Sequence, residues 1–296
     1  MPSPLTTQNL TKHFGDRAAL RSLTFELPAG RVAGLLGRNG AGKTTLLNLA
    51  CGLLLPTTGT CTTLGRASSG LDTPELRRLG IVFQEGRFVP WMTVAQQLAF
   101  NASFHPAWDK ARESRLLAEL ELDATRRIVQ LSPGDQQKVG VLLGVCHHPE
   151  LLLLDEPMSA LDPIARAQLL AFLIDLVAED GSTILISSHL LADVEKIVDW
   201  VVCLDAGELA VSAPFDELQE SYAEWIVTAQ ASDLPAAFAE PFVLWREGGA
   251  GQARLLVRAG AAEAQAFRER YRAEVAVRPL NLDQLFPLLI KERRAA

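Results

Sequence analysis

Residues 37–45, Gly-Arg-Asn-Gly-Ala-Gly-Lys-Thr-Thr, restrict the possible folds more than any other stretch of this sequence. They match G-x-x-x-x-G-K-[ST], the pattern of a loop that wraps around phosphate groups. The apolar run at 31–36 is typical of a buried strand, and residues 45–50 continue as a helix that ends near Gly52. This strand–loop–helix context disfavours a chance glycine turn before a lysine. The sequence therefore predicts a nucleoside triphosphate site in an α/β domain.

The chemistry of a triphosphate explains the residue types in this loop. Its several negative charges need many donors at short range, and glycines let consecutive backbone N–H groups point at an anion. The helix that follows adds its N-terminal N–H groups and the positive end of its dipole. We expect Lys43 to contact the β- and γ-phosphates and the Thr44 hydroxyl to bind Mg²⁺. The predicted nucleotide-binding residues of the loop are Gly37, Arg38, Asn39, Gly40, Ala41, Gly42, Lys43, Thr44 and Thr45.

Two carboxylates end a second apolar run, Leu-Leu-Leu-Leu-Asp-Glu at 151–156. The run predicts a buried parallel strand, and the carboxyl ends of such strands are where α/β sheets bind ligands. We expect Asp155 to hold Mg²⁺, largely through water, and Glu156 to position the attacking water. Simple helix capping is the alternative, which the four leucines and the upstream phosphate loop disfavour. His189 follows another predicted strand, 182–187, and is placed to donate to the γ-phosphate, although a lone histidine is usually structural.

Residues 131–138, Leu-Ser-Pro-Gly-Asp-Gln-Gln-Lys, contain the signals of a helix start. Ser132 is a preferred N-cap, and Pro133 suits the first helical position. Asp135 stands three residues after the cap, as in a capping box with Asp in place of Glu. The sequence therefore predicts a helix that runs from here to the residue before Pro149.

Strands alternate with helices along most of residues 1–220, which predicts a mostly parallel sheet with right-handed crossovers. Residues 5–27 predict two further strands that break at Gly15. From about 86–135, helical spacing replaces strand formers, which indicates a helical insertion. We expect residues 1–220 to form the nucleotide domain. Residues 221–296 are expected to form a small α+β accessory domain, with a ferredoxin-like arrangement as the candidate fold.

Three features stay open to more than one interpretation. Phe14, at the break between the first two strands, is either an edge residue of the core or an aromatic platform for a base. The apolar residues of 88–92 open the helical insertion, where they are either packed inside or form an exposed patch for a partner. Residues 221–296 show no catalytic spacing. They cover the nucleotide domain, regulate it or support a dimer, and we favour dimer support.

Composition disfavours several classes of protein. The net charge of −7 over 296 residues argues against a nucleic-acid-binding surface. No apolar run approaches the roughly 20 residues that cross a bilayer, and the start of the chain lacks the basic and apolar regions of a signal peptide. The four cysteines are scattered, which is typical of free thiols in a reducing cytosol. We therefore expect a cytoplasmic protein that does not itself span a membrane and binds no nucleic acid.

Over roughly residues 5–220, the order of these motifs resembles the ATP-binding subunits of ABC transporters. The resemblance implies a RecA-like parallel core, an antiparallel β subdomain and a helical insertion. It is specific because several short motifs follow one another in the family's order. The matches are Walker A at 37–45, the Q-loop glutamine at Gln84, the signature motif at 131–138, Walker B with its catalytic glutamate at Asp155 and Glu156, the D-loop at 159–162, the switch histidine at His189 and the adenine-stacking aromatic at Phe14.

The resemblance implies an ATPase that uses ATP and Mg²⁺. In the family, the glutamine at the Gln84 position also reaches Mg²⁺, and two subunits form a head-to-tail homodimer or heterodimer. Each ATP then lies between Walker A of one subunit and the signature motif of the other, here Ser132 and Gly134. Closure of the dimer drives transmembrane permease subunits, which hold the ATPase at the cytoplasmic face of the cell membrane. Because hydrolysis removes the bridging phosphate, the nucleotide state switches the dimer.

Within the family, two features look like stand-alone bacterial ATPases of exporter systems: the separate tail and the sequence Phe-His-Pro-Ala-Trp at 104–108. We therefore expect an exporter. The alternative is a soluble ABC ATPase that acts on ribosomes or DNA, which a single cassette, the lack of a heptad run and the acidic balance disfavour. A simple P-loop kinase ranks lowest, because it has no use for the Ser132 motif or the D-loop.

The signature motif departs from the family's usual Leu-Ser-Gly-Gly-Gln, because this chain has Leu-Ser-Pro-Gly-Asp. Pro133 removes one backbone donor, although those of Ser132 and Gly134 remain. Asp135 places a carboxylate within about a turn of the expected phosphate, where it repels the anion. We therefore predict weaker ATP-dependent dimerisation than a glutamine at position 135 would give.

Overall fold

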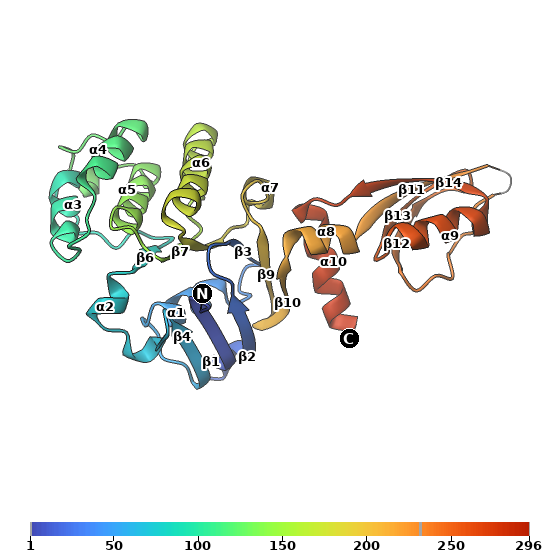
Figure 1. The fold of residues 1–296 in the computed structure, drawn as a ribbon, viewed down its shortest axis with the longest axis horizontal. Helices are drawn as coiled ribbons and strands as arrows, with labels where there is room; N and C mark the ends of the chain where they lie inside the picture. Colours follow the sequence, from blue (N-terminus) through green and yellow to red (C-terminus); the bar gives the residue numbers. More distant parts are fainter. Residues whose placement is uncertain (1, 231–232, 296) are drawn as a thin grey trace. The chain divides into compact units, whose positions relative to one another are not determined.

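The computed structural model describes residues 2–230 and 233–295, and the chain divides into two compact units, Met1–Ser212 and Ala213–Ala296 (Figure 1). The sequence placed the boundary a few residues later, after Glu220. Each unit has a hydrophobic core of its own. Within the described residues, no helix is both long enough and apolar enough to cross a lipid bilayer.

The first unit is built on a six-stranded sheet in the order β10-β9-β3-β8-β7-β6. β3 pairs in parallel with β8 and β9, and β7 pairs in parallel with β6 and β8. The phosphate loop therefore leaves the middle of the sheet, beside strands whose carboxyl ends point the same way. This confirms the predicted parallel core. The strands span Val32–Gly37 (β3), Leu79–Val82 (β6), Leu151–Asp155 (β7), Thr183–Ser187 (β8), Trp200–Asp205 (β9) and Glu208–Pro214 (β10).

Helices cover both faces of this sheet. α1, Lys43–Ala50, packs between the sheet and the β subdomain, where its Leu46 and Leu49 are fully buried. α5, Pro133–Val145, and α6, Pro163–Asp180, lie on the opposite face (Figure 1). Because both faces are covered, every residue of β7 and β8 is buried, as the unbroken apolar runs in their sequences predict.

The antiparallel β subdomain has the strand order β2-β1-β4-β5. The first two strands turn at Gly15, as predicted, and Phe14 stands opposite Arg17 across the turn. β4 pairs with β1 but was not predicted, because residues 53–79 show turn signals rather than a clear strand alternation. The strands span Leu5–Phe14 (β1), Arg17–Leu27 (β2), Thr58–Thr63 (β4) and Arg66–Ala67 (β5).

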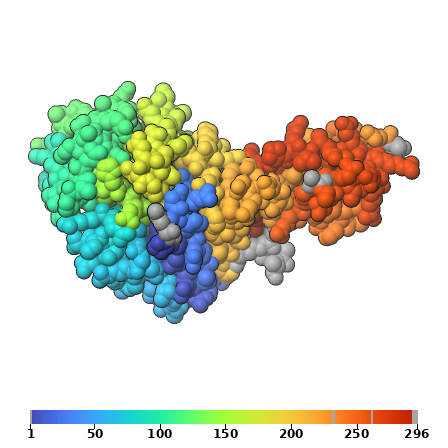
Figure 2. Space-filling model, in the orientation of Figure 1, coloured from blue at the N-terminus to red at the C-terminus, as the bar shows by residue number. Residues whose placement is uncertain are grey.

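The predicted helical insertion is present, and its helices begin at side-chain caps. Thr93 caps α3 and Asp109 caps α4, each by accepting from backbone N–H groups of the first turn. Buried Arg112 of α4 makes two hydrogen bonds to Asp180, at 2.8 and 3.2 Å, which fasten the insertion to the end of α6. In the space-filling view, the insertion (green) lies beside α2 (cyan) (Figure 2). The remaining helices of this unit span Thr73–Leu76 (α2), Val94–Ala102 (α3), Lys110–Glu119 (α4) and Leu191–Val194 (α7).

The second unit is an antiparallel four-stranded sheet in the order β12-β13-β11-β14, with α9 packed on one face. Trp225 and Phe267 meet edge to face in its core, with ring centroids 5.3 Å apart. This confirms the predicted α+β appendage. The described residues 233–242, between β11 and β12, form no helix, so the unit is one helix short of a ferredoxin-like β-α-β-β-α-β pattern. Its elements span Phe215–Ser221 (α8), Ala223–Ala229 (β11), Val243–Gly248 (β12), Gln252–Val257 (β13), Ala261–Tyr271 (α9), Ala273–Pro279 (β14) and Leu282–Ala295 (α10).

Candidate nucleotide-binding site

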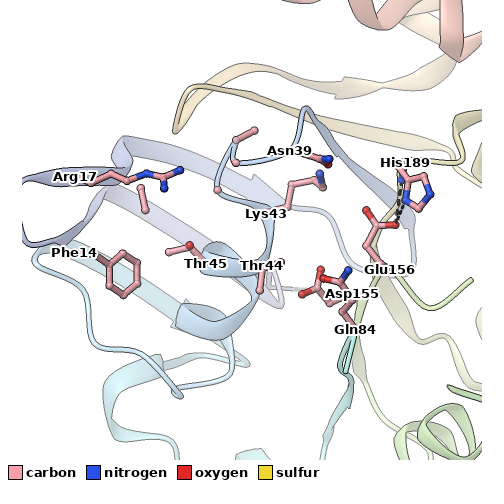
Figure 3. A pocket seen from close by; sticks show the side chains of 14 residues that line it. Phe14, Arg17, Asn39, Lys43, Thr44, Thr45, Gln84, Asp155, Glu156 and His189 are labelled. Carbon is pink, nitrogen blue, oxygen red and sulfur yellow. Dashed lines mark hydrogen bonds and ion pairs between the residues drawn. The ribbon is translucent and has the colours of Figure 1, made fainter. Parts of the chain in front are cut away.

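Most of the predicted site residues meet at one cavity of about 720 Å³ in the first unit (Figure 3). They come from the β1–β2 hairpin, the phosphate loop with the start of α1, and the segments that follow β6, β7 and β8. Of the predicted loop residues, Gly37 and Arg38 do not line the cavity. The lining residues are Phe14, Arg17, Ala19, Asn39, Gly40, Ala41, Gly42, Lys43, Thr44, Thr45, Gln84, Asp155, Glu156 and His189.

The phosphate loop requires glycine at position 42. Gly42 has φ +106°, and a Cβ atom there would lie 2.6 Å from Leu20 Cδ2 and 2.7 Å from the Ala19 carbonyl oxygen. The loop is thus packed directly against β2. Lys43 is buried, and its Nζ donates to the Gly37 carbonyl oxygen at 2.8 Å, which holds the ammonium inside the loop. An ammonium beside the N-terminus of α1 attracts phosphate oxygens.

Asp155 and Glu156 follow each other at the end of β7, with 6% and 8% of their surface exposed. Ser187 of β8 contacts both, because its Oγ donates to Asp155 Oδ1 at 2.7 Å and accepts from the Glu156 N–H at 3.0 Å. Glu156 has φ +51°, a strained conformation that concentrates at functional sites. The two carboxylates are therefore held in defined orientations. The sequence did not single out Ser187, since a serine that ends a strand carries no signal of this contact.

His189 lies against Glu156 (Figure 3). Its Nδ1 is 2.7 Å from Glu156 Oε2, and its backbone N–H donates to the same oxygen at 3.2 Å. A neutral imidazole that donates from Nδ1 keeps only an acceptor at Nε2, so donation to a phosphate from Nε2 requires the imidazolium. The contact that the structure shows is thus with the carboxylate, and the predicted contact with a γ-phosphate stays a prediction.

Thr44, Gln84 and Asp155 share the cavity and fit the predicted Mg²⁺ site. Their hydroxyl, amide and carboxylate oxygens are the hard ligands that Mg²⁺ prefers. In the part of the chain that the structure describes, no group of three or more His, Cys, Asp or Glu residues could hold a metal ion. An ion held by Thr44, Gln84 and Asp155 would take its remaining ligands from phosphate oxygens and water, which is how Mg²⁺ is usually bound with nucleotides.

Ser132 and Gly134 lie outside the cavity lining of their own chain. Ser132 is the N-cap of α5, and its Oγ accepts from the Asp135 N–H at 3.1 Å. Gly134 is in close contact with the D-loop, because a Cβ atom there would lie 2.7 Å from the Ala160 carbonyl oxygen. The predicted helix start is therefore confirmed. The predicted contact of Ser132 and Gly134 with a nucleotide bound to another subunit stays a prediction.

Asp135 turns toward two cations instead of completing the predicted capping box. Its carboxylate lies 4.0 Å from Arg126 Nη1 and 3.7 Å from Lys138 Nζ, and both pairs are partly exposed. Such pairs offset the carboxylate charge only in part, because solvent screens them. The expected repulsion of a phosphate at the start of α5 is therefore reduced but not removed.

We expect Asp135→Gln to strengthen ATP-dependent dimerisation by about threefold, a small effect because exposed charge interactions contribute below about 1 kcal/mol. Sedimentation in ATP, with turnover blocked by Glu156→Gln in both proteins, measures the dimer dissociation constant. Glu119→Gln is the matched control, since it removes an exposed carboxylate of α4. Unchanged or weaker dimerisation of the Asp135→Gln protein would count against the repulsion.

Phe14 lines the cavity with 50% of its surface exposed, so it is not an edge residue of the core. Lys12 Nζ lies 5.1 Å from the centre of its ring. This placement favours the platform interpretation. The structure also brings Arg17 and Ala19 to the cavity, which the sequence did not single out. Their place in the hairpin could have predicted this. Arg17 pairs with Phe14 across the strands and therefore shares its face of the sheet, and Ala19 lies two residues further along the same strand.

Comparisons with known proteins agree with this geometry. The family model for ABC transporters matches residues 20–159. The bacitracin transport ATP-binding protein BcrA of Enterococcus faecalis is 33% identical over 218 residues, covering 73% of this chain and 71% of that protein. The molybdenum import ATP-binding protein ModC of Paramagnetospirillum magneticum is 36% identical over 205 residues, covering 66% of this chain and 56% of that protein. A solved dimeric ATP-binding cassette in a post-hydrolysis state, bound to ADP and Pi, has a TM-score of 0.63 and 25% identity, covering 71% of this chain and 98% of that one.

The fold and the site define a P-loop ATPase with the cassette architecture, and the comparisons agree. The chain belongs to the family of ABC transporter ATP-binding proteins. It is an ATP-binding subunit whose ATPase activity is coupled to transport. Subunits of this family dimerise and work with transmembrane permease components.

Proposed function

We propose that this subunit hydrolyses Mg²⁺-bound ATP at the cavity of Figure 3 and so drives the cycle of an exporter. The contact of 2.7 Å between Glu156 and His189, beside Lys43, carries this proposal. It holds a buried carboxylate at the same cavity as the phosphate loop. Glu156 orients a water for in-line attack on the γ-phosphorus and accepts a proton from it, while ADP leaves.

Other residues of the cavity are proposed to bind the adenine, the phosphates and Mg²⁺. Phe14 stacks on the adenine, and the backbone of the phosphate loop binds the β- and γ-phosphates together with Lys43. Thr44, Gln84 and Asp155 would hold Mg²⁺, which when bound neutralises part of the phosphate charge. His189 keeps Glu156 in place through the two contacts to Oε2. Each role is supported by the joint position of these residues at one cavity.

We further propose a head-to-tail homodimer or heterodimer as the working state. Ser132 and Gly134 do not line the cavity of their own chain, so a second subunit must present them. Its α5 would add backbone N–H groups and the positive end of a helix dipole to the bound phosphates. Because this bridge depends on the γ-phosphate, ATP binding closes the dimer and hydrolysis opens it.

We propose export as the direction of transport. BcrA, named for bacitracin transport, is matched over 71% of its own length. Relatives named for import are similar to the chain as well, because ModC and the methionine protein MetN of Brucella abortus are matched over 56% and 66% of their own length. The resemblance of the segment 104–108 and of the separate second unit to the stand-alone ATPases of exporters is the support for export.

Exposed apolar side chains on the helical insertion are the proposed contact with the permease. Trp91 is 73% exposed, and Val129 beside it donates its backbone N–H to the residue before Trp91 at 3.1 Å. Phe100 and Phe104 are also exposed, with ring centroids 5.2 Å apart. Of residues 88–92, Trp91 thus fits the interpretation of an exposed patch, and large exposed patches mark interaction sites. A permease bound there would hold the subunit at the cytoplasmic face of the membrane.

Capture of the tagged full-length chain from detergent-solubilised membranes of its host tests this function. We expect a multi-span membrane protein to co-purify, and Trp91→Ala to reduce its yield by about tenfold because buried tryptophans dominate interface energies. Leu55→Ala, an exposed apolar residue far from the insertion in the sequence, is the control and should leave the yield unchanged. Ribosomal proteins or DNA captured without a membrane protein would overturn the proposal in favour of a soluble ABC ATPase.

A further inference from the structure

Arg17 is a cation at the nucleotide cavity for which neither the motifs nor the comparisons provide a role. It begins β2, lines the cavity and is exposed. We propose that Arg17 binds the α-phosphate of the nucleotide and so fixes the phosphate chain between the hairpin and the phosphate loop. The inference rests on the proposed nucleotide site and adds a residue from outside the phosphate loop.

The hairpin places Arg17 next to the proposed adenine platform. Phe14 and Arg17 are direct cross-strand partners on either side of the turn. Side chains of such partners share one face of the sheet, and both of these line the cavity. Figure 3 shows the two side chains entering from the same side, with the Arg17 guanidinium reaching toward the phosphate loop. Arg17 therefore stands at the end of the cavity where the nucleoside is proposed to bind.

The distance from Arg17 to the phosphate loop is short. A Cβ atom built on Gly40 would lie 3.4 Å from Arg17 Nη2. Gly40 belongs to the part of the loop that precedes the buried Lys43. The two cations thus approach the loop from different elements, and Lys43 is assigned to the β- and γ-phosphates. In a bound nucleotide, the α-phosphate lies between the β-phosphate and the nucleoside whose base is proposed to stack on Phe14. We therefore assign the α-phosphate to Arg17.

The strand that carries Arg17 is fixed against the loop. Two and three residues further along, Ala19 and Leu20 lie so close to Gly42 that no side chain fits at position 42. The Arg21 N–H donates to the Gly207 carbonyl oxygen at 2.7 Å, and the Gly207 N–H donates to the Ala41 carbonyl oxygen at 3.2 Å. Because β2 and the loop are joined through these contacts, the hairpin cannot move Arg17 away without disturbing the loop.

The charge of Arg17 is available for a ligand. Within residues 2–230 and 233–295, no carboxylate forms an ion pair with it. Lys12, the other cation near Phe14, already donates to the Leu55 carbonyl oxygen at 2.8 Å. A guanidinium can donate two parallel hydrogen bonds to one phosphate, so it suits a phosphodiester-like group better than a hydroxyl of the ribose.

Titrations of the full-length chain with ADP, AMP and adenosine test the assignment, because the first two carry an α-phosphate and the third does not. We expect Arg17→Gln to weaken the binding of ADP and of AMP by about tenfold each, as the loss of one charged hydrogen-bonded contact predicts. Adenosine binding should stay unchanged, and Arg17→Lys should recover part of the loss. In turnover, KM for ATP should rise about tenfold while kcat stays within about twofold, since the contact exists before and during the reaction.

Arg21→Gln is the matched control, because it removes the same charge from the same strand outside the cavity. Unchanged ADP affinity in the Arg17→Gln protein would overturn the inference. An equal loss for adenosine would assign Arg17 to the base, and a loss for ADP without one for AMP would assign it to the β-phosphate; either result overturns the α-phosphate role. If the unsubstituted chain bound no ADP, the proposed nucleotide site itself would fail, which separates the two conclusions.

Discussion

Replacing Glu156 by glutamine is expected to lower ATP turnover by at least about 100-fold, because an amide cannot accept the proton of the attacking water. The substitution keeps the size of the side chain and an oxygen that accepts from the His189 backbone. ATP affinity should therefore stay within about twofold of the original. Phosphate release at saturating ATP measures turnover, and calorimetric titration measures affinity.

The same substitution should trap an ATP-bound dimer, because closure is driven by binding and opening requires hydrolysis. Light scattering after size-exclusion chromatography, with ATP in the buffer, reports the mass of the particle. Glu150→Gln is the control, since it removes a carboxylate of an exposed ion pair with Arg78 just before β7. Turnover of the Glu156→Gln protein at the original rate would refute the role assigned to this carboxylate.

Replacing Lys43 by alanine is expected to weaken ATP binding by about 10- to 100-fold, which corresponds to about 1.5–3 kcal/mol for hydrogen bonds to a charged group. The ammonium is buried and held inside the loop by the Gly37 carbonyl oxygen, so alanine removes the charge from the interior of the loop. Turnover should fall further than affinity, because negative charge develops on the oxygen between the β- and γ-phosphates as the bond to ADP breaks, and Lys43 is assigned to both phosphates. Titration with ATP and phosphate-release assays measure both effects.

Lys110→Ala is the matched control for this second substitution. Lys110 lies in α4 and forms an exposed ion pair with Glu113, so its loss should change neither affinity nor turnover. The thermal unfolding temperature of each variant shows whether the fold is kept. If the Lys43→Ala protein kept its nucleotide affinity and turnover, the assignment of residues 37–45 as a phosphate-binding loop would be contradicted. Together with Glu156→Gln, this substitution separates binding from chemistry within one cavity.

Much of the site was predictable because its residues belong to continuous motifs. The phosphate loop is a single run of residues, so the pattern of its glycines and Lys43 predicts phosphate binding without information from distant parts of the chain. Asp155 and Glu156 were predicted as site residues because an unbroken apolar run ends at them, and parallel strands gather their carboxyl ends at one edge of a sheet. The second unit was also predictable, since its strands and helices show separate and regular patterns.

Contacts between distant segments were not predictable in the same way. Ser187 joins Asp155 and Glu156 only because β7 and β8 are neighbours with one register, which no local pattern reveals. Arg17 reaches the cavity because a hairpin turns back on itself and packs against Gly42. Asp135 was expected to complete a capping box, yet nearby cations attract its carboxylate.

By itself, the sequence determined that this protein binds a nucleoside triphosphate, because the phosphate groups are bound by one contiguous loop whose residue pattern can be recognised. It also determined the alternation of strands and helices, since burial on both faces of a sheet requires unbroken apolar runs. Only the tertiary structure decided how the groups are held and oriented: the 2.7 Å contact of His189 with Glu156, the exposure of Trp91 and the place of Arg17. These depend on distances between segments far apart in the chain, which packing sets and local sequence does not.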